Sequence, residues 1–191
     1  IAAAAAATLL ALPVAGYAAR SSSRLSTISD RLTYVGYAVP GVVIALALLY
    51  LSTEFAQSLY KTVPLLVFAY VVRFLPQAVG SVRSSVLQVD PKLTEAARTL
   101  GRSSTGAFRE VTLPLIAPGV AAGAALVFLT TMKELPATLM LSPLGFETLV
   151  SYIWLVRGAG SYGAAAIPAL VLVGVSALSM VVILAQERYN G

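Results

Sequence analysis

The chain has no cysteine and no histidine among its 191 residues. These absences exclude Ser-His-Asp and Cys-His nucleophile arrangements, metal sites built from histidine or cysteine, and disulfide frameworks. Charge is also scarce, because only 11% of the residues are charged while 58% are hydrophobic and the mean hydropathy is +0.85. A soluble domain of this length needs more charged groups to cover its surface. The composition therefore predicts an integral membrane protein.

Long stretches without charge mark the predicted membrane spans. Four ranges contain no Asp, Glu, Lys or Arg, namely 1–19, 32–53, 111–132 and 158–186, and a fifth, 62–82, contains only Arg73. Roughly 20 apolar residues cross a bilayer as a helix, so we expect an all-α polytopic membrane protein with about five transmembrane helices. The alanine-rich start suggests a chain cut within a helix. A signal peptide is the alternative, but it lacks the basic leader that such peptides need.

Basic residues are divided unequally between the two sides that alternating spans define. Residues 20–31, 83–110 and 187–191 fall on one side with nine Lys and Arg, whereas 54–61 and 133–157 fall on the other with three. Basic loops are retained in the cytoplasm, which fixes the orientation. The net charge of +5 thus reflects topology and suits anionic membrane lipid, and it gives no support for a nucleic acid partner.

The predicted cytoplasmic segment 83–110 contains eight charged residues and has helix signals of its own. Asp90 suits an N-cap, Pro91 the first helical position and Gly101 the position just after the end, so a short helix is predicted over 91–100. A second short helix is predicted to follow it and to run into the next span. The apolar residues of the first helix form one narrow stripe at helical spacing, made of Leu93, Ala96, Ala97 and Leu100.

The same segment resembles the EAA loop of permease subunits in binding-protein-dependent ABC importers. The resemblance lies in the order Glu95-Ala96-Ala97, Gly101, Val111 and Leu113-Pro114. It implies a type I importer permease bundle in a bacterial cytoplasmic membrane, with 83–112 as the cytoplasmic coupling loop. The residues that the resemblance assigns to ATPase coupling are Glu95, Ala96, Ala97, Arg98, Gly101, Leu113 and Pro114.

That resemblance also implies partners. In such importers the loop docks on separate ABC ATPase subunits that carry Mg-ATP, and a periplasmic substrate-binding protein delivers the cargo. The alternative interpretation of the loop is an ordinary amphipathic helix packed on its own bundle.

Further stretches look like the second half of the double-length permeases of the iron(III) importer group. They are residues 69–76, 130–138 and 145–149. Because those permeases carry two related halves on one chain, the resemblance implies that 1–191 is an N-terminally truncated permease domain working with a second permease half or subunit. It favours iron(III) as the cargo. Thiamine, polyamine, phosphonate and sulfate are alternatives, since their importers share the loop.

Two charged residues outside the loop are candidates for the transport pathway. Arg73 lies ten residues before Arg83, roughly 15 Å along a helix, so it stands inside the hydrocarbon layer, where a cation is costly. It is predicted to bind carbonyl groups near Pro76 or to line the pathway, and the structural role is favoured because a cation would repel iron(III). Glu134 follows the fourth span. It is either a boundary residue at the headgroups or a carboxylate that favours cationic cargo at the outer mouth.

A short apolar pattern near the C-terminal third predicts one more helix. Its residues recur at helical spacing, as Phe146, Leu149, Val150, Ile153 and Trp154. About 12 residues are too few to span a bilayer, so we expect an amphipathic helix lying at the outer interface. It serves either as a plain anchor or as a platform for a soluble binding protein.

Enzyme classes are excluded by missing parts. The chain has no GxxxxGK[ST] phosphate loop, so we expect it to bind no cofactor directly and to hydrolyse no ATP itself. An aspartyl intramembrane protease needs two membrane-embedded aspartates, whereas the only two here, Asp30 and Asp90, fall in predicted loops. Two rival functions remain, a secondary transporter driven by an ion gradient and a structural scaffold of a membrane complex.

Overall fold

A computed structural model of the chain describes residues 1–20, 36 and 38–190. Every regular element in that part of the chain is helical. The start of the predicted span 32–53 and nearly all of the predicted loop 20–31 lie outside the described residues.

From α3 onward, short connections join the helices in sequence. Proline stands in the first turn of three of these helices, where its missing N–H removes no helical hydrogen bond. The bounds are α1 Ala2–Arg20, α3 Gly41–Glu54, η1 Gln57–Leu59, α4 Val63–Gln88, α5 Pro91–Thr99, α6 Ser104–Ala107, the π-helical turn η2 Phe108–Thr112, α7 Leu113–Met132, α8 Pro136–Leu141, α9 Leu149–Gly158 and α10 Tyr162–Asn190.

Three of the described helices are long and apolar enough to cross a membrane. They are Val63–Gln88, Ser104–Met132, which joins α6, η2 and α7, and Tyr162–Val181 within α10. These helices confirm the spans predicted over 62–82, 111–132 and 158–186. The other two predicted spans correspond to shorter apolar helices, Ala2–Tyr17 and Gly41–Glu54.

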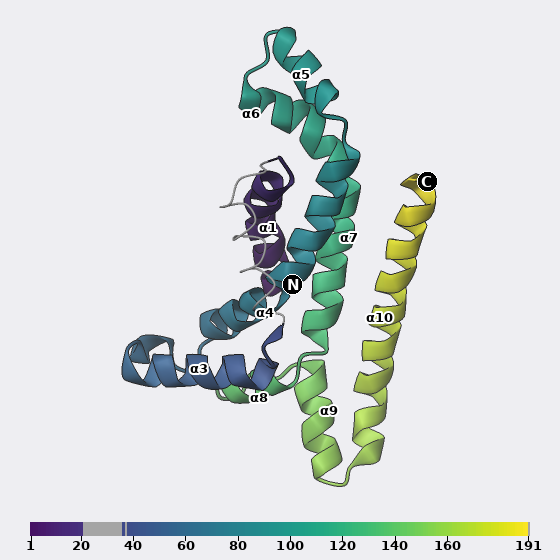
Figure 1. Cartoon of the computed structure of the whole chain (residues 1–191). Coiled ribbons are helices and arrows are strands. Elements are labelled where there is room, and N and C mark those ends of the chain that lie inside the picture. The colour runs from purple at the N-terminus through teal and green to yellow at the C-terminus, as the bar shows by residue number, and fades with distance from the viewer. Residues whose placement is uncertain (21–35, 37, 191) are drawn as a thin grey trace.

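Helix α3 differs from the predicted span in length and direction. The prediction ran through Pro40, but the helix begins at Gly41 with Pro40 as its N-cap. Proline lacks the N–H that continues a helix, and it drives the preceding residue out of the helical conformation. As a result α3 runs crosswise to α7 and α10, at the end of the bundle where α8 lies (Figure 1).

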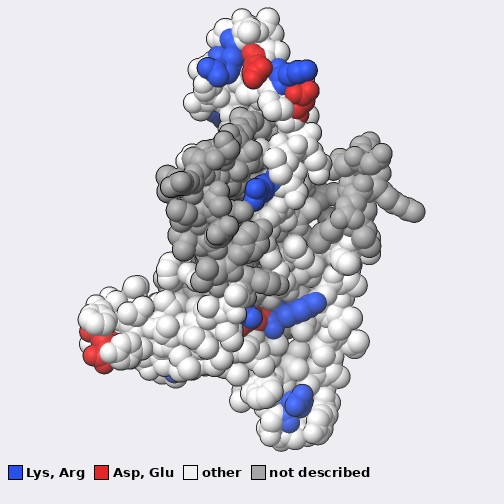
Figure 2. Space-filling view, viewed as in Figure 1, with Lys and Arg blue, Asp and Glu red and all other residues white. Residues whose placement is uncertain are grey.

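The connections fall at two opposite ends of the bundle, as the charge distribution predicts. Helices α5 and α6 lie at one end together with the C-terminal end of α10, whereas α8 and the turn between α9 and α10 lie at the other (Figure 1). Figure 2 shows acidic and basic side chains gathered over the projecting end that α5 and α6 form.

Helix α9 begins three residues later than predicted and has a different orientation. Thr148 and Ser151 cap each other: Oγ1 of Thr148 accepts from the Ser151 N–H at 3.2 Å, and Oγ of Ser151 accepts from the Thr148 N–H at 2.8 Å. A tight turn containing Gly160, at φ +77°, then reverses the chain. The helix therefore packs alongside α10 instead of lying flat across the end, and Trp154 stays half exposed.

Small side chains bring α1 against α4. Ala7, Ala11 and Ala15 have no exposed surface and repeat every four residues, which places them on one face of α1. Lipid tails are as apolar as protein, so helix association in a membrane depends on close packing rather than on removal from water. The alanine face permits that close packing on α4, the principal neighbour of α1.

The contact between α4 and α7 is closer still. A Cβ added at Gly123 would lie 2.6 Å from Cβ of Ser81, and one added at Gly119 would lie 2.9 Å from Cβ of Ser85. Two glycines four residues apart thus face two serines four residues apart. The spacing is the small-xxx-small pattern of membrane helix pairs.

We expect Gly123→Ala to push α4 and α7 apart and to lower the free energy of unfolding by about 1–3 kcal/mol, the usual cost of overpacking. The measurement is unfolding of the purified protein in detergent by denaturant titration. Gly174→Ala in α10 is the matched control, because no atom lies within 4 Å of the added Cβ there. Equal stability of the two variants would contradict the close packing.

Candidate functional site

The short helix α5 is set by signals at both of its ends. Asp90 accepts a hydrogen bond from the N–H of Lys92 at 2.9 Å. At the other end the N–H of Arg102 bonds to the Ala97 carbonyl and that of Gly101 to the Arg98 carbonyl, with Gly101 at φ +88°. This is a Schellman closure, which requires a left-handed residue just after the helix. The helix predicted over 91–100 is confirmed to within one residue.

Three of the four residues of the apolar stripe of α5, Leu93, Ala96 and Leu100, are exposed. Leu93 is 48% exposed and Leu100 is 84% exposed, and α5 has no buried residue. The fourth stripe residue, Ala97, is half-buried and forms the inner face together with Thr94. Most of the stripe is therefore not packed on the described part of the bundle.

An open groove of about 510 Å³ adjoins α5 on its polar side. Nε of Arg102 lies 3.1 Å from Oε2 of Glu110, so one basic side chain of this groove is already paired across the loop. The lining residues are Glu95, Arg98, Thr99, Arg102, Ser103 and Ser104. Two of the residues assigned to ATPase coupling by resemblance, Glu95 and Arg98, thus share this groove.

The second predicted short helix is confirmed, and it is continuous with the following span. Ser103 caps it by accepting from the N–H of Gly106 at 3.1 Å. Leu113 and Pro114 stand in the first turn of α7, directly after the π-helical turn. They belong to the start of the span and not to the exposed helix.

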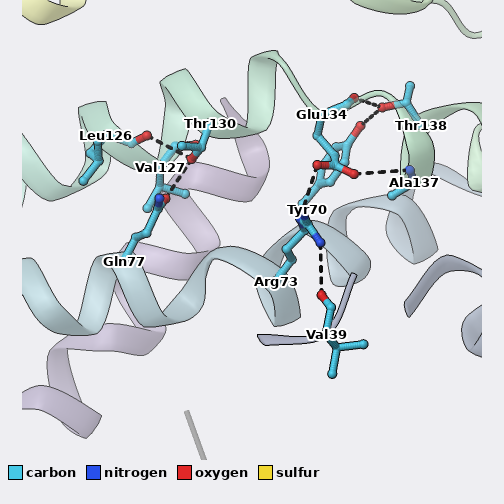
Figure 3. A network of polar contacts seen from close by, with 10 residues as sticks. All are labelled: Val39, Tyr70, Arg73, Gln77, Leu126, Val127, Thr130, Glu134, Ala137 and Thr138. Atoms are coloured by element: carbon cyan, nitrogen blue, oxygen red, sulfur yellow. Dashed lines mark hydrogen bonds and ion pairs between the residues drawn. The ribbon is translucent and has the colours of Figure 1, made fainter. Parts of the chain in front are cut away.

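The structure brings the two pathway candidates together at the opposite end of the bundle. Nε of Arg73 lies 3.2 Å from Oε2 of Glu134, and Nη1 of Arg73 donates to the Val39 carbonyl at 3.2 Å (Figure 3). The Glu134 side chain is only 8% exposed and that of Arg73 26%. Pairing offsets most of the cost of placing either charge in an apolar layer.

One prediction about these residues is corrected. The stretch near Pro76 is not broken, because α4 continues through it, and Arg73 donates elsewhere. The accepting group is supplied by Val39, where the chain leaves the helical path ahead of Pro40. The Glu134 side chain is buried at the junction of α7 and α8, whereas its neighbour Lys133 is exposed.

More polar side chains surround the ion pair, and sequence reasoning missed them. Thr138 bonds to both the Tyr70 hydroxyl and the Glu134 carbonyl, and Thr130 donates to Oε1 of Gln77 at 2.8 Å (Figure 3). On α4 the sequence contained a usable signal. Tyr70, Arg73 and Gln77 recur at helical spacing, so they lie on one face of the helix.

Gly41 completes the site by leaving room for the ion pair. A Cβ at this position would lie 2.6 Å from Oε1 of Glu134 and 2.8 Å from Nη1 of Arg73. The first residue of α3 therefore touches both charges, and the positive end of the helix dipole faces the carboxylate. Among the described residues no group of three or more Asp and Glu stands close enough to bind a metal ion.

Removing either partner of this pair leaves the other charge buried. We expect Arg73→Met and Glu134→Gln each to lower the free energy of unfolding by about 3 kcal/mol, the low end for buried pairs because Arg73 keeps some exposure. The double variant should lose less than the sum of the two, with a coupling energy of at least about 1 kcal/mol. Denaturant titration in detergent measures all three.

Arg157→Met is the matched control, because Arg157 is exposed and its guanidinium stacks on the Trp154 ring at 5.6 Å. Strictly additive losses at positions 73 and 134 would show that the two side chains do not act as a pair.

Known proteins resemble the chain along nearly its whole length. It is 43% identical to the Fe(3+)-transport system permease protein FbpB 2 of Haemophilus influenzae over 86% of its own residues and 33% of that protein. It is 33% identical to a probable molybdenum ABC transporter permease of Haloferax volcanii over 86% of its residues and 63% of that protein. The chain thus spans one third to two thirds of the length of these relatives.

The fold agrees with these sequence relatives. A crystal structure of an amino acid ABC transporter superposes with a TM-score of 0.68 over 98% of this chain and 87% of that one, at 20% identity. The family described as "binding-protein-dependent transport system inner membrane component" matches residues 8–188. The chain, a multi-pass helical membrane protein, belongs to that family of inner membrane permease components.

Proposed function

We propose that the chain forms the permease part of an ATP-driven importer and that α5 is its docking element for a separate ABC ATPase subunit. The single observation that carries the proposal is the exposed apolar stripe of α5, capped at both ends and carried beyond the spans. A helix of nine residues is unstable in isolation, and exposed leucines are costly in water. A partner with an apolar groove would stabilise the helix and remove its leucines from water.

Each part of the loop has a physical task in this proposal. The small side chain of Ala96 lets a partner's groove close around the helix, and that of Ala97 lets the inner face of the helix lie close to its own loop. Gly101 provides the sharp reversal that keeps the helix short. Glu95 and Arg98 lie on the polar side of α5 and would form charged contacts at the rim of the partner's groove.

The mechanism that follows is alternating access. Mg-ATP binding would bring paired ATPase subunits together, move the docked helices and open the bundle outward to receive cargo from a periplasmic binding protein. A ligand shifts such an equilibrium only by binding the two states with different affinity. The face of α5 must therefore contact the ATPase differently in the two states. A second permease half or subunit would complete the pathway.

Iron(III) is the cargo that the relatives favour. The ferric permease of Haemophilus influenzae shares more identical residues with this chain than the molybdenum permease of Haloferax volcanii does. A hard trivalent cation needs several oxygen ligands, about six, whereas the site near Arg73 offers the one carboxylate of Glu134. The protein would therefore conduct the cargo without chelating it, and the binding protein would set specificity.

Charge placed on the stripe should separate the ATPase from the permease. We expect Ala96→Glu and Gly101→Asp to reduce ATP-driven uptake in proteoliposomes by at least about tenfold and to release the ATPase subunit during purification, because a carboxylate would be desolvated in an apolar groove. Membrane insertion should be unchanged, since both positions are exposed.

Thr105→Glu is the matched control, because it adds the same charge at an exposed position of the same loop. Thr105 lies on α6, outside the groove that Glu95 and Arg98 line. Normal uptake by the Ala96 and Gly101 variants would remove the docking role. Uptake by the permease without any ATPase would favour a secondary transporter, and a complete absence of cargo movement would favour a scaffold.

The cargo is tested by uptake of radioactive iron. We expect the full-length protein, reconstituted with its ATPase and binding protein, to accumulate ⁵⁵Fe(III) in an ATP-dependent manner, and molybdate or a phosphonate in excess not to compete. Accumulation of labelled molybdate in place of iron would transfer the assignment to the oxyanion importers.

A further inference from the structure

The π-helical turn η2 lies where the projecting loop meets span α7. The N–H of Leu113 bonds back to the carbonyl of Phe108, five residues earlier, in place of the usual four. The turn therefore holds one residue more than an α-turn would. Such turns are rare and are frequently found at functional sites.

The extra residue determines which side chains face inward. Ala107 and Thr112 both have no exposed surface although they are five residues apart, whereas Arg109 and Glu110 between them are exposed. In an uninterrupted α-helix, positions five apart diverge by roughly 140°, so both would not point at one neighbour. The widened turn brings Thr112 onto the buried face.

Thr112 meets α5 there. Its Oγ1 lies 3.2 Å from Oγ1 of Thr94, the half-buried residue on the inner face of α5. A second tie joins the same two segments, since Arg102 just after α5 pairs with Glu110 of η2. That pair is solvent-exposed on both sides, 59% and 49%, and exposed pairs hold weakly. These two ties, among the described residues, thus both end on the π-helical turn.

We propose that Thr94 and Thr112 are positioning residues for coupling, whose hydrogen bond carries a displacement of α5 into α7 through η2. The proposal rests on the docking role of α5 and adds to it the path that leads from the docked helix to the span. α5 buries no side chain of its own in the bundle, so without this bond it would tilt on its loop while α7 stayed in place. The exposed residues of the docking face, Leu93, Ala96 and Leu100, and the half-buried transmitting residue Thr94 lie on different sides of α5, which makes the two roles separable.

The test uses Thr94→Val and Thr112→Val in the full-length protein assembled with its ATPase. Valine keeps the shape of threonine and removes the hydroxyl. We expect the ATPase to co-purify in full and ATP hydrolysis to continue, while uptake per ATP hydrolysed falls about fivefold, the size that one net hydrogen bond sets. Thr94→Ser and Thr112→Ser keep the hydroxyl and should restore the ratio.

Thr99→Val is the matched control. Thr99 also lies on α5, but it is exposed and its hydroxyl donates to the Ala96 carbonyl within the same helix, at 2.8 Å. Uptake per ATP by the Thr99→Val variant should equal that of the unaltered protein. An unchanged ratio in Thr94→Val would overturn the proposal, as would loss of the ATPase from either valine variant, because the threonines would then serve docking or folding. A failure of docking itself is recognised separately, by normal uptake in Ala96→Glu.

A covalent version of the tie provides a second measurement in case Thr112→Val folds poorly. The 191 residues contain no cysteine, so Thr94→Cys with Thr112→Cys introduces one defined pair. We expect oxidation of the pair to a disulfide, detected by the change in mass, to restore uptake per ATP. Reduction of the disulfide should lower this ratio again. A disulfide that forms and leaves the ratio at its reduced value would overturn the proposal.

Discussion

The ion pair between Arg73 and Glu134 ties three segments of the chain to one point. Arg73 comes from the middle of α4, Glu134 from the junction of α7 and α8, and the Val39 carbonyl and Gly41 from the start of α3. An arginine inside an apolar layer must find partners, and few arrangements provide a carboxylate and a free carbonyl at once. The pair thus anchors the N-terminal end of α3.

The seam between α4 and α7 continues this tie along the bundle. The contact runs from the ion pair toward α5. It includes first the hydrogen bond between Thr130 and Gln77. The close approaches of Ser81 to Gly123 and of Ser85 to Gly119 follow. Tightly packed helices deform little, and discrete shifts of whole elements are the usual response to a load. A displacement that enters α7 at its first turn would therefore move α4 with it and reach the ion pair.

Local signals and long-range contacts differ in how much the sequence reveals. Asp90, Pro91 and Gly101 act within a few residues of where they stand, so the bounds of α5 could be predicted to within one residue. The burial of Glu134 could not be predicted from the sequence, because it depends on Arg73, which lies on another span. Helical spacing of Tyr70, Arg73 and Gln77 indicates which face of α4 is polar. It does not say which helix faces it, and the same limit applies to the direction of α3 and α9.

The caps and ties of α5 also bear on how a partner would bind it. Asp90 and the Schellman closure fix the backbone of α5, and Thr94 holds its inner face, although Leu93 and Leu100 remain exposed. A helix that is already ordered loses little conformational entropy on binding, so contact with its apolar face translates more fully into affinity. Preorganisation has a mechanical consequence as well. A flexible loop would absorb a displacement by changing its own shape, whereas a capped helix hydrogen-bonded to the π-helical turn ahead of a span would pass the displacement on.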